Sequence, residues 1–336
     1  IRASPPPMLL FSPSIPLPVA ALAAGMEALW GYPPRLLGLV GHPVMWVGAL
    51  IDRLERTLNR ADAPERVRRI LGFVALALII AIPLALTTAL LGVGYTLLPA
   101  PVMLLVQAAL ASTLVAQRSL WVHVRAVGTA LRHNGLTGGR KAVSMIVGRD
   151  TTGLDEAAIV RAALESLAEN FSDGIVAPLL WTALLGLPGA VFYKSVNTAD
   201  SMIGHMSPRY KAFGMAAARL DDLINLPASR LAALCLMLAA PRQKWPHIWQ
   251  TVRRDAPRHR SPNAGWPEAA MAAALNTLLA GPRSYGGHMT KDPWIGSGTS
   301  GARTADLDRG LHLYRRACGV LIAGLLCTAL GCMIAQ

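Results

Sequence analysis

Two adjacent apolar segments constrain the fold most strongly. Residues 70–98 read ILGFVALALIIAIPLALTTALLGVGYTLL, which exceeds the roughly 20 apolar residues that a helix needs to cross a bilayer. Pro99 to Pro101 then form a turn, and residues 101–117, PVMLLVQAALASTLVAQ, are apolar again. Because basic residues flank this pair, we expect a helical membrane hairpin with its tip on the non-cytoplasmic side.

The composition agrees with a helical membrane protein. Hydrophobic residues fill 53% of the 336 positions and charged residues only 15%, whereas soluble domains carry about 25% charged residues. Aromatic residues make up only 6%, and the abundance of Ala and Leu favours helices over a barrel. We predict an all-α, polytopic helical membrane protein with roughly four to six membrane-embedded segments and cytoplasmic helical regions.

The net charge of +13 has two interpretations. Nucleic-acid binding would gather the basic residues on one soluble face. Here they flank apolar runs instead, as in cytoplasmic loops of membrane proteins. We therefore predict no nucleic-acid partner, although some of these cations could serve anionic substrates. The cluster before residue 70 consists of Arg53, Arg56, Arg60, Arg66, Arg68 and Arg69.

We expect residues 1–336 to form a single integral membrane domain. Its predicted parts are N-terminal membrane segments at 19–117, cytoplasmic helices at 118–173, a membrane-embedded site region at 174–240, a cytoplasmic loop and helix at 241–316, and a C-terminal span at 317–335.

Local patterns predict further elements within these parts. Residues 41–60 have the apolar periodicity of an amphipathic helix. Thr152 or Asp155 is placed to cap a helix that runs to about Asn170. Prolines and glycines interrupt residues 174–193, so a broken or re-entrant helix is at least as well supported as a straight span. A helix of small residues is predicted at 264–281, followed by a glycine-rich loop at 286–301.

Polar clusters border the apolar run that begins at residue 174. On a helix, Glu165, Glu169 and Asp173 share one face, and Arg161 could pair with Glu165. Asn170 lies where this helix meets the apolar run. Charges beside such a run are costly unless they are paired or bind something. Carboxylate and amide oxygens suit Mg²⁺, while the alternative is a solvated helix face.

Two more clusters follow the apolar run. Lys194, Asn197 and Asp200 share one helical face, where the lysine could be a membrane-interface anchor or could bind phosphate. In the sequence ARLDD, Asp221 and Asp222 precede another apolar run and need a cation or an aqueous pocket.

Three other features are weaker. The glycine-containing strings at 135–141 and 147–153 lack the spacing of a phosphate-binding P-loop, so a nucleotide would bind by another geometry. His42 is interpreted as a packed or capping residue. The sequence SPNAGWPE, with Ser261, Asn263 and Glu268, is interpreted as the start of a helix.

Six stretches together resemble the CobD/CbiB family of adenosylcobinamide-phosphate synthases, which are membrane proteins of cobalamin biosynthesis. They occur in the family's order and cover roughly residues 25–290. They read GHPVMWVGALI, IVGRDT, ESLAENFSDGIVAPLLWTALLG, YKSVNTADSMIGH, RYKAFGMAAARLDDLINLPASRL and HRSPNAGWPEAAMAAAL.

The resemblance implies an ATP-dependent acid–amine ligase that uses ATP and Mg²⁺. Such an enzyme joins a corrinoid substrate, adenosylcobyric acid, to (R)-1-amino-2-propanol phosphate or ethanolamine phosphate. The resemblance also implies a multi-pass protein of the inner (cytoplasmic) membrane, with its site facing the cytoplasm. The membrane cobalamin synthase would be a neighbour in the lipid bilayer.

Roles are assigned to the polar residues as hypotheses under this resemblance. Catalytic candidates are Glu169, Asp173, Asp221 and Asp222, and metal-ligand candidates are these four together with Asp200. Substrate- or phosphate-binding candidates are Arg149, Lys194, Arg209, Arg219, Asn170, Asn197 and Asn263. The alternatives are a transporter for a corrinoid or anionic solute, or a non-catalytic membrane signalling or scaffold protein.

Overall fold

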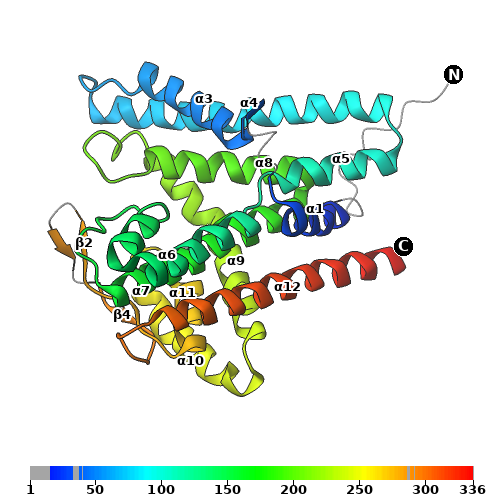
Figure 1. The fold of residues 1–336 in the computed structure, drawn as a ribbon. Coiled ribbons are helices and arrows are strands. Elements are labelled where there is room, and N and C mark those ends of the chain that lie inside the picture. The colour runs from blue at the N-terminus through cyan, green and yellow to red at the C-terminus, as the bar shows by residue number, and fades with distance from the viewer. Residues whose placement is uncertain (1–15, 33–37, 40, 286–287, 291, 336) are drawn as a thin grey trace. The chain divides into compact units, whose positions relative to one another are not determined.

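The computed structural model describes residues 16–32, 38–39, 41–285, 288–290 and 292–335. These residues are almost entirely helical, with a few short strands (Figure 1). Five helical stretches are long and apolar enough to cross a membrane, which confirms the predicted fold class. They are Glu65–Leu97, Ala100–Val143, Glu156–Ile203, Met215–Ala239 and Thr304–Ile334.

Backbone contacts divide the chain into two units. Unit 1 contains the described residues up to Ala116, then Ala177–Ile224 and the residues from Gly324 onward. Unit 2 contains Gln117–Val176 and Asn225–Ala323. The assignment of one domain, and of residues 118–173 and 241–316 to the cytoplasm, stays a prediction.

Unit 1 is built from helices that pack along one another. The helices α3, α4 and α8 lie side by side, and α1 packs against α5 and α8 (Figure 1). Pro99 separates α4 from α5, so the two apolar runs form two successive helices as predicted, while the side of the membrane on which their connection lies stays a prediction. The bounds are α1 Pro16–Trp30, α3 Pro43–Leu58, α4 Glu65–Leu97, α5 Ala100–Ser112, α8 Ala177–Ile203 and, in its first part, α9 Met215–Ala239.

Two local predictions in this part of the chain are confirmed. The amphipathic segment forms α3, and His42 caps its start by accepting a hydrogen bond from the amide of Val44. The apolar segment after residue 173 is a broken helix, because Gly186 inside α8 has φ 68° and ψ −156°. Such a left-handed φ costs a residue with a side chain far more than it costs glycine.

Unit 2 packs α7 against α6 and α11. Asp155 caps α7 by accepting a hydrogen bond from the amide of Ala158 at 2.7 Å. Of the two predicted caps, Thr152 and Asp155, the structure thus uses Asp155. The bounds are α6 Gln117–Val143, α7 Glu156–Phe171, a π-helical turn at Ser172–Val176, α10 Trp245–Asp255, α11 Gly265–Leu275, and the 3₁₀ turns Arg242–Lys244 and Ala256–Arg258. The first part of α12, Thr304–Ile334, also belongs here.

Two predictions in unit 2 need correction. The helix predicted at 264–281 ends at Leu275, because Asn276 takes a left-handed conformation with φ 57°. The predicted glycine-rich loop contains strands, since β1 (Leu279–Ala280) pairs with β4 (Trp294–Ile295) and β2 (Arg283–Tyr285) pairs with β3 (His288–Thr290). The last helix starts at Thr304 and includes the predicted C-terminal span, whose bounds stay a prediction.

Candidate functional site

In unit 1, two of the predicted clusters meet. On α8, the Lys194 ammonium donates a hydrogen bond to the side-chain oxygen of Asn197 at 3.2 Å. The Asn197 amide in turn donates to a carboxylate oxygen of Asp221 on α9 at 3.4 Å. Asp221 is buried, with 8% of its surface exposed. A cation, an amide and a buried carboxylate thus form one chain of polar contacts between the two helices.

Two further carboxylates lie in the same unit. Asp200 is half-buried, Asp222 is exposed, and their negative charges interact. Arg219, on the same turn of α9, is exposed. Carboxylates that repel one another favour a bound cation, so the oxygen donors here fit a hard ion such as Mg²⁺.

Among the described residues, no three His, Cys, Asp or Glu side chains converge on a preformed metal position. Proteins often bind Mg²⁺ through one or two carboxylates together with substrate phosphates. The Asp200–Asp222 pair fits that form of binding better than a closed protein cage. Metal binding by the five candidate carboxylates stays a prediction.

A tight loop sets the start of α9, and with it the position of Asp221. The amide of Gly204 donates to the Asp200 carbonyl at 2.7 Å, which ends α8. A Cβ atom on Gly214 would lie 1.6 Å from the Ile203 carbonyl oxygen. On α4, a Cβ atom on Gly72 would lie 2.0 Å from the Phe213 carbonyl oxygen. Only glycine allows these backbones to approach so closely.

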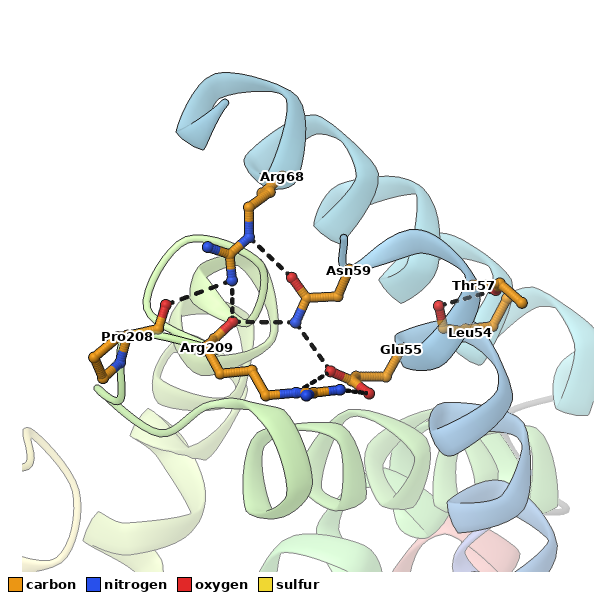
Figure 2. Close-up of polar contacts among 7 residues, drawn as sticks. All are labelled: Leu54, Glu55, Thr57, Asn59, Arg68, Pro208 and Arg209. Atoms are coloured by element: carbon orange, nitrogen blue, oxygen red, sulfur yellow. Dashed lines mark hydrogen bonds and ion pairs between the residues drawn. The ribbon is translucent and has the colours of Figure 1, made fainter. Parts of the chain in front are cut away.

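Arg209, a phosphate candidate, lies in this loop and binds a carboxylate (Figure 2). Its guanidinium donates to both oxygens of Glu55 on α3, at 2.7 and 2.8 Å. Asn59 donates to Glu55 at 3.0 Å and to the Arg209 carbonyl at 3.1 Å. Arg68 at the start of α4 donates to Asn59 at 3.0 Å and also to the carbonyl of Arg209. The network therefore fastens the loop to α3 and α4.

We expect this network to make stability depend on pH. The hydrogen bonds from Arg209 hold the pKa of Glu55 below its ordinary value. Ionised Glu55 therefore stabilises the fold fully above its unfolded-state pKa of about 4.3. This stabilisation is lost as the pH falls through the lower folded-state pKa of Glu55. Glu55→Gln should lower the free energy of unfolding by about 1–3 kcal/mol at pH 7, and the difference from wild type should shrink in acid.

Denaturant unfolding of both proteins at pH 7 and in acid measures this difference. Glu65→Gln is the matched control, because Glu65 pairs with Arg69 on the surface, where both side chains are at least half exposed. It should change stability little at either pH. The prediction would be contradicted if the difference in the free energy of unfolding between wild type and Glu55→Gln were the same at pH 7 and in acid.

In unit 2, Arg149 is held by a buried carboxylate. Its guanidinium donates to Glu165 on α7 at 3.0 Å, and only 10% and 7% of the two side chains are exposed. The other oxygen of Glu165 accepts the amide of Ala280 at 2.8 Å. Glu165 thus forms an ion pair with Arg149. Its predicted partner Arg161 also attracts it electrostatically.

The remaining candidates of the first cluster lie at the end of α7. Glu169 is exposed and lines a cavity of about 240 Å³. The Asn170 amide donates to the Ser166 carbonyl at 2.9 Å, so it binds its own helix. Asp173 is half-buried in the π-helical turn.

Asn263 lies in a different part of unit 2 and is buried. Its side-chain oxygen accepts hydrogen bonds from Ser229 and from Arg230, each at 3.1 Å. Arg230 also lies over the Trp266 ring, with 4.4 Å to the ring centroid. This set fixes the start of α11 against α9, and substrate or phosphate binding by Asn263 stays a prediction.

Sequence reasoning gave no site role to several polar residues that line cavities in unit 2. His259 faces Glu268 at 3.7 Å and Arg260 binds Asp292 at 2.6 Å. The HRSPNAGWPE stretch contains three of these four residues and was the pattern that could have found them. Asp292 lies within the segment predicted as a glycine-rich loop, where no pattern pointed to it.

Fold and site together define a class, an all-α polytopic membrane protein with carboxylate, amide and cationic side chains gathered at helix ends. The sequence profile of the CobD/Cbib protein family matches residues 20–314. The chain belongs to the CobD/CbiB family.

Curated relatives cover nearly the whole chain, and each bears the name cobalamin biosynthesis protein CobD. The relative from Sinorhizobium sp is 47% identical over 317 residues, which are 93% of this chain and 98% of the relative. The Rhodobacter capsulatus relative is 49% identical, covering 88% of this chain and 92% of its own. The Brucella anthropi relative is 42% identical, covering 89% and 93%. No solved structure matches the chain significantly.

Proposed function

We propose that the protein acts in cobalamin biosynthesis by ATP-dependent amide ligation. It would join adenosylcobyric acid to (R)-1-amino-2-propanol phosphate or ethanolamine phosphate, giving adenosylcobinamide phosphate or its analogue. The observation that carries the proposal is the family match over residues 20–314, together with relatives at 42–49% identity named as cobalamin biosynthesis proteins. The arginines that flank the apolar runs support an inner-membrane protein whose site faces the cytoplasm.

The chemistry requires activation of a carboxylate. A carboxylate oxygen of the corrinoid attacks the γ-phosphorus of ATP and ADP leaves, which gives an acyl phosphate. The amine nitrogen then bonds to the acyl carbon, loses a proton, and inorganic phosphate leaves. Phosphoryl transfer depends mainly on positioning and on neutralising negative charge, and Mg²⁺ supplies such neutralisation when it is bound.

The polar groups on the chain suit these tasks. Asp200, Asp221 and Asp222 are the oxygen donors that would hold Mg²⁺ with the phosphates of ATP. In unit 1, Lys194 is the cation for phosphate oxygens, while Asn197 orients Asp221. In unit 2, Arg149 is the candidate for binding a phosphate group. Because the amine must lose its proton to attack, a carboxylate base is needed. The candidates are Asp221 and Asp222 in unit 1 and Glu169 in unit 2.

Purified protein in lipid nanodiscs tests the proposal directly. It is incubated with adenosylcobyric acid, the amino alcohol phosphate, ATP and Mg²⁺, and the amide and ADP are measured by mass spectrometry. We expect both products in equal amounts, and neither without ATP. If folded protein makes neither, the ligase function is wrong, and uptake of corrinoid into proteoliposomes without ATP would favour a transporter.

A further inference from the structure

An elongated cavity of about 380 Å³ lies in unit 1, among helices α3, α4, α5 and α8. Helix α8 packs against each of the other three (Figure 1). The lining runs from Ile82 to Leu90 on α4 and from Leu187 to Ser195 on α8, which is about 12 Å along each helix axis. The volume is within the range of protein sites that hold small ligands.

The cavity is mainly apolar. Its described lining residues are all apolar except for Thr87, Thr113, Lys194 and Ser195. The hydroxyls of Thr87 and Thr113 donate to backbone carbonyls of their own helices, at 2.8 and 2.7 Å. The other two polar residues are neighbours on α8 and lie at one end of its part of the lining. An apolar cavity of this kind binds apolar molecules more readily than water.

The cavity borders on the apolar outer surface of unit 1. Leu86 and Leu90, which line it, are 67% and 56% exposed. They belong to α4, which is long and apolar enough to cross a membrane. Trp46 on α3 also lines the cavity and is exposed. Lipid tails are as apolar as leucine, so an acyl chain can enter the cavity sideways from the bilayer.

The Ser195 hydroxyl indicates that the ligand carries a hydrogen-bond acceptor. Ser195 is only 1% exposed, and its Oγ has no hydrogen-bond partner among the described residues. Buried hydroxyls in native proteins are nearly always hydrogen-bonded. Because Ser195 lines the cavity, an acceptor bound there would explain this group. The ester and phosphate oxygens of a phospholipid are acceptors of this kind.

Positive charge gathers at the same end of the cavity. Lys194 lines it next to Ser195, and so does the start of α3 at Pro43 and Val44. The start of a helix carries a partial positive charge. His42, which caps α3, interacts electrostatically with Lys194, so this helix start and the ammonium group are close together. A negatively charged head group suits this end of the cavity.

We propose that the cavity binds one acyl chain of an anionic phospholipid, with an oxygen of the head region at Ser195 and the negative charge near Lys194. The inference concerns the bilayer and does not depend on the proposed ligation. Lys194 also donates to Asn197 at 3.2 Å, and Asn197 donates to Asp221. The lipid would therefore lie next to the candidate site of unit 1.

Native mass spectrometry of the full-length protein in detergent tests the proposal, without ATP or corrinoid. The protein is titrated with phosphatidylglycerol, which is anionic, and with phosphatidylcholine of the same acyl chains. Wild type should bind phosphatidylglycerol about fivefold more tightly, as expected for one basic residue near a head group. Phosphatidylglycerol with a photoreactive group on its chain should label the peptides that contain residues 82–90 and 187–195.

Variants of the lining should give a crossed pattern. Lys194→Gln should remove the preference for phosphatidylglycerol and leave phosphatidylcholine binding unchanged. Ser195→Ala should weaken both lipids about twofold to tenfold. Val191→Trp should fill the cavity, weaken both lipids about tenfold or more and abolish the labelling. Val93→Trp is its matched control, because Val93 is exposed on α4 outside the lining, and it should bind like wild type.

Ser112→Ala is the matched control for Ser195→Ala. The Ser112 hydroxyl lies outside the lining and donates to the Ala109 carbonyl at 2.7 Å, so this variant should bind both lipids like wild type. Melting temperatures identify any variant that fails to fold. If Val191→Trp fails to fold, the conservative Ser195→Ala still decides the test.

Four results would each overturn the proposal. In the first, photolabelling of residues 82–90 and 187–195 is the same in wild type and in folded Val191→Trp. In the second, Lys194→Gln keeps the wild-type preference for phosphatidylglycerol. In the third, Ser195→Ala binds both lipids like wild type. In the fourth, adenosylcobyric acid displaces the lipid, which would assign the cavity to the corrinoid.

Discussion

Replacing Asp221 by asparagine is expected to lower the rate of amide formation by about 10²- to 10⁴-fold, while the protein still inserts into the membrane. Asp221 is the buried end of the contact chain that starts at Lys194. Asparagine has nearly the same shape but no negative charge, so it could no longer help to hold Mg²⁺ or accept a proton. Because this substitution removes the charge and keeps the side-chain volume, a fall in the rate reports the loss of the charge and not a packing defect.

The measurement is turnover of purified variant in nanodiscs, with the melting temperature as a check on folding. Asp62→Asn is the matched control, since Asp62 is exposed and pairs with Arg60 at 3.1 Å, and it should keep wild-type turnover. Glu169→Gln is expected to be strongly impaired as well. Normal turnover in both Asp221→Asn and Glu169→Gln would refute the assignment of the site.

The sequence could predict those parts of the fold that depend on neighbouring residues. The membrane hairpin follows from two apolar runs with a proline turn between them, and the start of α7 follows from the cap at Asp155. The break in α8 was expected from its glycines and prolines. The end of α11 was placed too late, because a left-handed Asn276 ends the helix although apolar residues resume at Leu278.

The site was predictable only within single helices. Periodicity placed Lys194 and Asn197 on one face, but their connection to Asp221 depends on the loop between α8 and α9. The ion pair of Arg209 with Glu55 was not predicted, because the two residues are 154 positions apart in the chain. Periodicity cannot show such contacts.

Gly72→Ala should give the largest loss of stability in the membrane hairpin. The new Cβ atom would lie 2.0 Å from the Phe213 carbonyl oxygen, far closer than atoms can approach. Helix α4 or the loop before α9 must then move. Overpacking of this kind costs about 1–3 kcal/mol and occasionally more. Because the displaced loop leads directly to Asp221, we expect turnover to fall together with the melting temperature.

Gly92→Ala is an unusually close control, because Gly92 lies on the same helix and a Cβ atom there meets nothing within 4 Å. Alanine favours a helix over glycine by about 1 kcal/mol, so this variant should be as stable as wild type or more so. The same substitution of glycine by alanine is thus expected to lower stability at position 72 and to keep or raise it at position 92. The melting temperatures of both variants in nanodiscs measure these changes. If Gly72→Ala melted like Gly92→Ala with full turnover, close packing of α4 on the loop would not be what positions Asp221.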